Sequence, residues 1–233
     1  LYINLKGLVD GAMDLRVGRQ DMLFGAGRVL LEGTPKDGSR TIYFDAARLT
    51  WHPNAQAAID LIGIYNQAET GLDIGPLDRD NTGFDKYSND LTESGGGVYA
   101  TFKNIPELPF ECYYLFKDES AWDSFDPGTP PQPVKRPGRQ THTFGTRLMP
   151  KLTSQIGFEF EGAAQIGETD DDHDVGGYLG YGGAIWTLPV EIAKARPTLT
   201  AGIYYLSGDD PDTADKDEGW NPLWSRYPQF SEL

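Results

Sequence analysis

The feature that most constrains the fold is an alternation of short and long connections, clearest around residues 40–67. Residues 40–51 are rich in β-branched and aromatic side chains, and the sequence HPNA that follows is a turn, because proline cannot continue a strand ladder and asparagine tolerates turn geometry. Residues 57–67 then return as a second strand. Polar segments of roughly twenty residues precede and follow the pair. Hairpins with short turns at one end and long loops at the other are typical of a transmembrane β-barrel.

The same rhythm runs along the chain and predicts an all-β fold of about ten antiparallel strands. The clearest strand alternates Ile156, Phe158 and Phe160 with Gly157, Glu159 and Glu161. Several strands reach about ten residues, which is long enough to cross a membrane at a tilt. The alternative is a soluble β-sandwich, whose strands are shorter and whose loops alternate less regularly in length. The expected strands cover residues 1–9, 14–20, 40–51, 57–67, 95–104, 110–117, 141–149, 154–167, 175–186 and 199–206.

Composition agrees with a β protein and sets limits on its class. The chain has 28 Gly, 12 Tyr and 11 Phe, and no run approaches 18 apolar residues, so no transmembrane helix is expected. It begins abruptly at Leu1 inside a strand, and we expect residues 1–233 to be a single β-barrel segment of a longer chain. A single cysteine, Cys112, allows no internal disulfide and is expected to be an inert buried or lipid-facing thiol.

The net charge of −15 argues against binding to nucleic acid, and its distribution is more informative than its size. Three segments, residues 68–93, 168–174 and 207–233, each carry a net charge of −5 and together account for the total. The strands between them are therefore neutral overall, and the acidity belongs to the long connections.

No residue has the spacing expected of a catalytic or metal site, so we expect neither an enzyme nor a required cofactor. His52, His142 and His173 lie apart, and there is no nucleophile elbow. The acidic tail is expected to be a solvated loop, with Ca²⁺ binding as the alternative because oxygen-rich loops bind that ion. The Ca²⁺ candidates are Asp209, Asp210, Asp212, Asp215 and Asp217.

If the apolar strand faces meet lipid, the opposite faces line a polar lumen of mixed sign. Trp51 next to a short turn fits an aromatic belt, which turns Arg48 inward by strict alternation. Arg48 is expected to pair with an acid on a neighbouring strand, with binding of a passing uronate as the alternative. The pore-lining candidates are Lys6, Arg16, Arg48, Lys103, Lys117, Arg147, Glu159 and Glu161, joined on the same faces by Asp14, Asp60 and Glu111.

Three motifs carry a resemblance to a known family: LRVGRQDMLFGAGRVL, GTPKDGSRTIYFDAARLTWHP and YYLSGDDPDTADKDEGWNPLWSRYPQFSEL. In combination they resemble the alginate export family of bacterial outer-membrane porins, in order from about Asp14 to Leu233. The resemblance implies a larger barrel of about 18 strands with short periplasmic turns and a basic lumen that passes a polyanionic polysaccharide. The bases at matching motif positions are Arg16, Arg19, Arg40 and Arg48.

The expected function is therefore a bacterial outer-membrane channel for passive passage or export of an alginate-like polyuronate or of small solutes. Expected partners are membrane lipid, lipopolysaccharide, the anionic polysaccharide, and surface or periplasmic proteins. Bases only slightly outnumber acids on the luminal faces, which weakens charge selectivity. The alternatives are an outer-membrane anchor for a surface assembly, and a soluble secreted protein that binds or cleaves carbohydrate, with Trp122, Trp220 and Trp224 along a groove.

Overall fold

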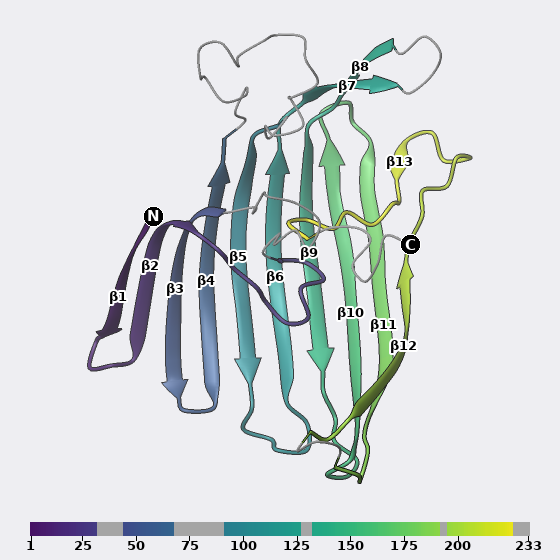
Figure 1. The fold of residues 1–233 in the computed structure, drawn as a ribbon. Helices are drawn as coiled ribbons and strands as arrows, with labels where there is room; N and C mark the ends of the chain where they lie inside the picture. The colour runs from purple at the N-terminus through teal and green to yellow at the C-terminus, as the bar shows by residue number, and fades with distance from the viewer. Residues whose placement is uncertain (32–43, 68–90, 127–131, 192–194, 226–233) are drawn as a thin grey trace, which may run out of the picture.

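The computed structural model describes residues 1–31, 44–67, 91–126, 132–191 and 195–225, and every regular element among them is a β-strand. Ten strands form an antiparallel sheet in the order β1-β2-β3-β4-β5-β6-β9-β10-β11-β12, as Figure 1 shows. An eleventh, two-residue strand, β13 (Lys216–Asp217), pairs in parallel with β11. This confirms the all-β antiparallel fold. Their bounds are Tyr2–Leu8 (β1), Met13–Gln20 (β2), Phe44–Asn54 (β3), Ala57–Asn66 (β4), Glu93–Phe102 (β5), Phe110–Glu119 (β6), Arg139–Leu148 (β9), Ile156–Thr169 (β10), Asp174–Thr187 (β11) and Thr198–Leu206 (β12).

One end of the sheet carries the short turns, and one of them differs from expectation. The sequence predicts that the strand before β4 ends at Trp51, but β3 runs on to Asn54. The pairing with β4 shifts between Trp51 and Asn54, so the turn itself is reduced to Ala55 and Gln56. Pro53 lies in this irregular stretch, where a strand can lack one ladder hydrogen bond.

The other end carries the long connections, and the sequence reasoning missed an element there. It predicts a loop over residues 118–140, but they contain the hairpin of β7 (Trp122–Asp126) and β8 (Gln132–Arg136), which pair only with each other. Strands of only five residues give too little periodicity to detect. At the same end, β10 and β11 are joined by a tight turn with Asp172 at a φ of 64°. Arg40 and most of the acidic segment 68–93 lie outside the described residues.

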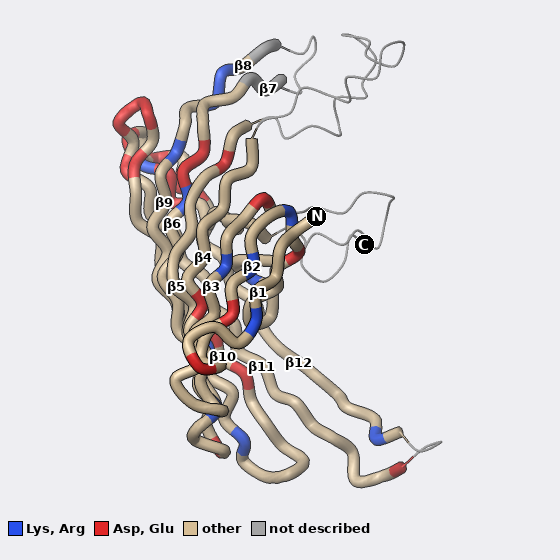
Figure 2. Tube along the Cα trace, turned by 90° about the vertical axis from the view of Figure 1, so that its left-hand side faces the viewer, with Lys and Arg blue, Asp and Glu red and all other residues tan. Residues whose placement is uncertain are grey.

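The sheet is curved, so it has a concave inner face and a convex outer face (Figure 2). Large apolar side chains are exposed on the outer face from β1 to β12, including Ile3, Val17, Trp51, Leu61, Phe144, Phe160, Tyr178, Trp186 and Ile203. The alternate residues on the same strands, such as Asp60, Tyr99, Leu115, Thr143 and Gln165, are buried on the inner face. None of the described residues forms a helix long and apolar enough to cross a membrane.

Two irregular segments cover the inner face and create the hydrophobic core. We call residues 21–31 the first inner segment and residues 207–225 the second inner segment; both cross in front of the sheet in Figure 1. They meet at a parallel bridge between Leu30 and Trp224, and the Ser225 hydroxyl donates a 2.6 Å hydrogen bond to the Gly27 carbonyl. Their buried side chains pack with the sheet in one cluster that includes Met22, Phe24, Leu30, Leu223, Trp224, Phe44, Ile62, Tyr99 and Leu115.

Candidate functional site

The sheet and the two inner segments bring most of the sequence-predicted ionisable residues together. Arg48, Lys117, Arg147, Glu159 and Glu161 all form ion pairs that lie on the inner face. The other three candidates lie outside these ion pairs. Arg16 is half-buried with its guanidinium 4.7 Å from the Tyr2 ring, Lys6 is exposed on the edge strand β1, and Lys103 follows the end of β5 in an exposed turn.

A cluster of two arginines and three glutamates lies at the centre of the inner face. The register places Glu111, Arg147 and Glu161 side by side across β6, β9 and β10. Arg147 donates to Glu159 at 2.9 Å and to Glu111 at 3.1 Å. Arg28, from the first inner segment, donates to Glu159 at 2.7 Å and also to Glu161. We refer to Arg28, Arg147, Glu111, Glu159 and Glu161 as the central cluster.

Two stacked tyrosines complete the hydrogen bonding of this cluster. The hydroxyl of Tyr99 donates to Glu111 at 2.6 Å, and that of Tyr113 donates to Glu161 at 3.0 Å. The two rings are nearly parallel with centroids 5.3 Å apart. Tyr113 lies across β9 at Gly145, where any side chain would overlap its ring. These hydrogen bonds satisfy carboxylates that would be costly to bury alone.

Arg28 is the member that sequence reasoning missed. Its side chain is 3% exposed, and its guanidinium lies 3.7 Å from the centre of the Tyr181 ring. Burial alone would lower the pKa of Arg28, but Glu159 and Glu161 more than offset this and raise the pKa above its ordinary value. Arg28 therefore holds the first inner segment against β10. The signal in the sequence was indirect: two glutamates on one strand face require a cationic partner.

Arg48 makes the structural pair expected of it. Its Nε donates to Asp60 on β4 at 2.8 Å, and the Thr50 hydroxyl donates to the same carboxylate oxygen. The guanidinium also lies 4.7 Å from the centre of the Phe24 ring. The Arg48 side chain is 29% exposed, so it differs from Arg28 in keeping access to solvent.

Lys117 ties the second inner segment to the sheet. Its ammonium group, 3% exposed, lies 2.6 Å from Glu93 and 2.9 Å from Glu119. It also donates a 2.6 Å hydrogen bond to the backbone carbonyl of Leu223. An ammonium has three protons to donate, and all three have acceptors here.

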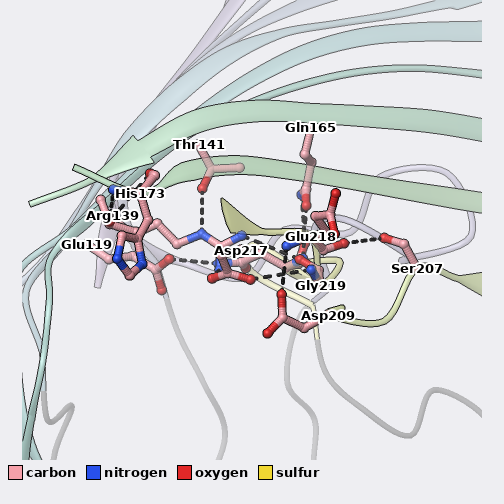
Figure 3. Close-up of polar contacts among 12 residues, drawn as sticks. Glu119, Arg139, Thr141, Gln165, His173, Ser207, Asp209, Asp217, Glu218 and Gly219 are labelled. Carbon is pink, nitrogen blue, oxygen red and sulfur yellow. Dashed lines mark hydrogen bonds and ion pairs between the residues drawn. The ribbon is translucent and has the colours of Figure 1, made fainter. Parts of the chain in front are cut away.

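A second set of polar contacts, shown in Figure 3, fixes the same segment near the long-connection rim. Arg139 on β9 pairs with Asp217 at 2.7 Å and donates to Thr141 at 3.2 Å. The Asn221 side chain donates to Glu119 at 2.8 Å, and Gln165 donates to the Asn221 carbonyl at 2.7 Å. The second inner segment is therefore anchored at both Asp217 and Asn221.

The acidic residues predicted as Ca²⁺ candidates lie in this segment and serve mainly as hydrogen-bond acceptors. Asp209 accepts from the backbone N–H of Glu218, and Asp210 accepts from that of Asp212, each at 3.0 Å. Asp217 is paired with Arg139. In the described ranges, no group of three or more His, Cys, Asp or Glu is arranged to hold a metal ion. Binding of Ca²⁺ remains a prediction.

The tryptophan groove expected for a soluble carbohydrate-binding protein is not formed as envisaged. Trp220 and Trp224 are buried, at 7% and 6% exposure, in the core beneath the second inner segment. Trp122 is half-buried and lines a cleft at the rim. Cys112 is a free, exposed thiol on β6.

Comparison with known proteins identifies a family. The sequence profile of the family described as alginate export matches residues 1–232. No curated protein and no solved structure matches the chain significantly.

Proposed function

This chain belongs to the alginate export family, and we propose that it forms part of the wall of an outer-membrane channel that exports an alginate-like polyuronate. Membership of a transport family supports polysaccharide export as the general function. The curved antiparallel sheet supports a barrel wall as the structure that performs it, since only helices and closed barrels satisfy every backbone hydrogen bond within a membrane.

The observation that carries the proposal is the contrast between the two faces of the sheet. The outer face exposes Leu61, Phe144, Phe160 and Ile203 along the middle of the strands, with Trp51 and Trp186 near the short turns. An apolar band edged by aromatic rings is the pattern expected of a lipid-facing surface. The inner face instead carries the ion pairs, which supports a polar lumen on that side.

The inner face carries two kinds of arginine: those held in ion pairs with glutamates, and those that are partly exposed to solvent and can contact a polyuronate. Arg28 and Arg147 are committed to glutamates, so their role is to hold the wall and the first inner segment in place. Arg16 and Arg48 keep partial access to solvent and could bind uronate carboxylates in a forked geometry. Neighbouring acids such as Asp60 compete for the same guanidinium, which keeps each contact weak enough for the polymer to move on.

A second candidate function is passive passage of small solutes. The near balance of acids and bases in the central cluster favours it, because such a lumen discriminates little by charge.

The proposal is tested by recording full-length protein in planar lipid bilayers. Alginate oligosaccharides should interrupt the open-channel current, and neutral dextran oligomers of equal length should do so less often. Equal interruption by both would support the small-solute function instead. Absence of channels from protein that shows heat-modifiable gel mobility would refute both.

A further inference from the structure

A cleft of ≈ 590 Å³ opens at the long-connection rim of the inner face, separate from the central cluster. Three stretches far apart in sequence form its walls. The base of the β7–β8 hairpin contributes Trp122 and Arg136, and the β10–β11 turn contributes Asp171 and His173. The second inner segment contributes Lys216 together with the carboxylates of Asp209 and Asp210. Its volume lies within the usual range of ligand sites, about 300–1,000 Å³.

The charged side chains on the floor of this cleft are already held in ion pairs and hydrogen bonds. Arg139 and Asp217 neutralise each other at 2.7 Å, and Glu119 is held by Lys117 and by the Asn221 amide. Figure 3 shows Arg139 of β9 reaching Asp217 in the second inner segment. A ligand therefore meets a floor that needs no rearrangement, which lowers the cost of binding.

The walls, in contrast, present groups that are free to bind. Trp122 and Arg136 are direct cross-strand partners at the base of the hairpin, so their side chains lie on the same face. Arg136 and Lys216 are exposed, and neither forms an ion pair with another residue in the described part of the chain. The Thr169 hydroxyl donates to Asp171 and lowers the pKa of that carboxyl, which stays ionised and able to accept hydrogen bonds.

We infer that this cleft is a docking site for a uronate-containing oligosaccharide, an inference that rests on the proposed export function. A pyranose ring stacks on Trp122, its carboxylate binds Arg136, and its hydroxyls donate to Asp171 and its acidic neighbours. A ligand made only of anionic groups would meet these aspartates with like charge. A hydroxyl-rich uronate satisfies both signs, and the cleft lies where a polymer would pass the rim.

The test is calorimetric titration of full-length protein in detergent micelles with an alginate tetrasaccharide and with a neutral glucose tetrasaccharide. Trp122→Ala and Arg136→Gln should each raise the Kd for the alginate oligomer by about tenfold, and Trp122→Phe should retain most of the affinity. Trp51→Ala and Arg196→Gln are matched controls at the opposite end of the strands and should leave the Kd unchanged. Heat-modifiable gel mobility confirms the assembly of every variant.

Unchanged affinity in both Trp122→Ala and Arg136→Gln would overturn the site, and equal affinity for the neutral tetrasaccharide would overturn its assignment to uronates. Bilayer recordings separate this inference from the proposed function. If alginate oligomers interrupt the channel current but the cleft variants bind alginate as tightly as the parent protein does, the cleft is refuted as the binding site and the channel function stands. If the protein forms no channel but the cleft variants lose alginate binding, the cleft is supported as the binding site and the channel function is refuted.

Discussion

At the scale of single residues, the degree of burial gives two arginines of the inner face different roles. Arg28 is sealed between two glutamates and the Tyr181 ring, so its loss would leave buried carboxylates without a cation. Arg48 shares Asp60 with Thr50 and is 29% exposed. Arg28 is therefore a structural group, and we propose Arg48 as the arginine whose charge an ion in the lumen senses.

Replacing Arg48 by glutamate should make the channel less anion-preferring. The change places a second carboxylate beside Asp60 on the inner face and makes the local charge more negative by two units. We expect the chloride-to-potassium permeability ratio to fall by about two- to fivefold at low salt, and by less at high salt because of screening. Single-channel reversal potentials measure this ratio. An unchanged ratio in correctly assembled protein would show that Arg48 does not face the conduction path.

At the scale of elements, the packing of the inner face depends on a glycine in β9 that leaves room for a tyrosine side chain of the neighbouring strand β6. Tyr113 on β6 lies across Gly145 of β9, and from there its hydroxyl reaches Glu161 on β10. One glycine thus allows a tyrosine to join three strands through a single hydrogen bond.

Gly145→Val should destabilise the assembled protein by about 2–4 kcal/mol, because the new side chain displaces the Tyr113 ring and leaves Glu161 short of a donor. Urea unfolding in detergent micelles measures the change. The matched control is Gly162→Val on the outer face of β10, where an added Cβ meets no atom within 4 Å. Equal stability of the two variants would mean that Tyr113 is not needed where it lies.

The strands were predictable from the sequence, but the two inner segments that cover the inner face of the sheet were not. Alternation in residues 156–161 and the HPNA turn located β10 and the β3–β4 hairpin to within a few residues, because a two-residue period survives when one face is polar. The inner segments have no period, so neither Arg28 nor the burial of Trp220 and Trp224 could be read from them. Pairing of Arg28 with Glu159 joins residues 131 apart in sequence, and local pattern cannot encode such a contact.

At the scale of the whole molecule, the arrangement is inverted relative to a water-soluble protein. Apolar side chains are exposed along the convex face, while ion pairs and the compact core lie on the concave face. Hydrocarbon over the convex face, as we propose for a barrel wall, would stabilise this distribution.

Phe144→Arg tests this distribution, since Phe144 is 51% exposed on the outer face near the middle of β9. Near the centre of a bilayer the substitution should cost about 2–4 kcal/mol and reduce the heat-modifiable fraction in outer-membrane extracts. Phe144→Leu is the control and should assemble normally. Were the protein water-soluble, the arginine would instead be harmless, and equal yields of both variants would contradict a lipid-facing surface.

The bridge between the two inner segments also bears on the order of folding. The Ser225–Gly27 hydrogen bond joins residues 198 apart, whereas neighbouring strands of the sheet are mostly joined by much shorter connections. Contacts between distant residues carry the largest loop-closure cost until the intervening chain is ordered. The hairpins should therefore assemble first and the inner segments dock last. In the channel that we propose, the interior would then be wide and unobstructed at first and would narrow only when these segments dock.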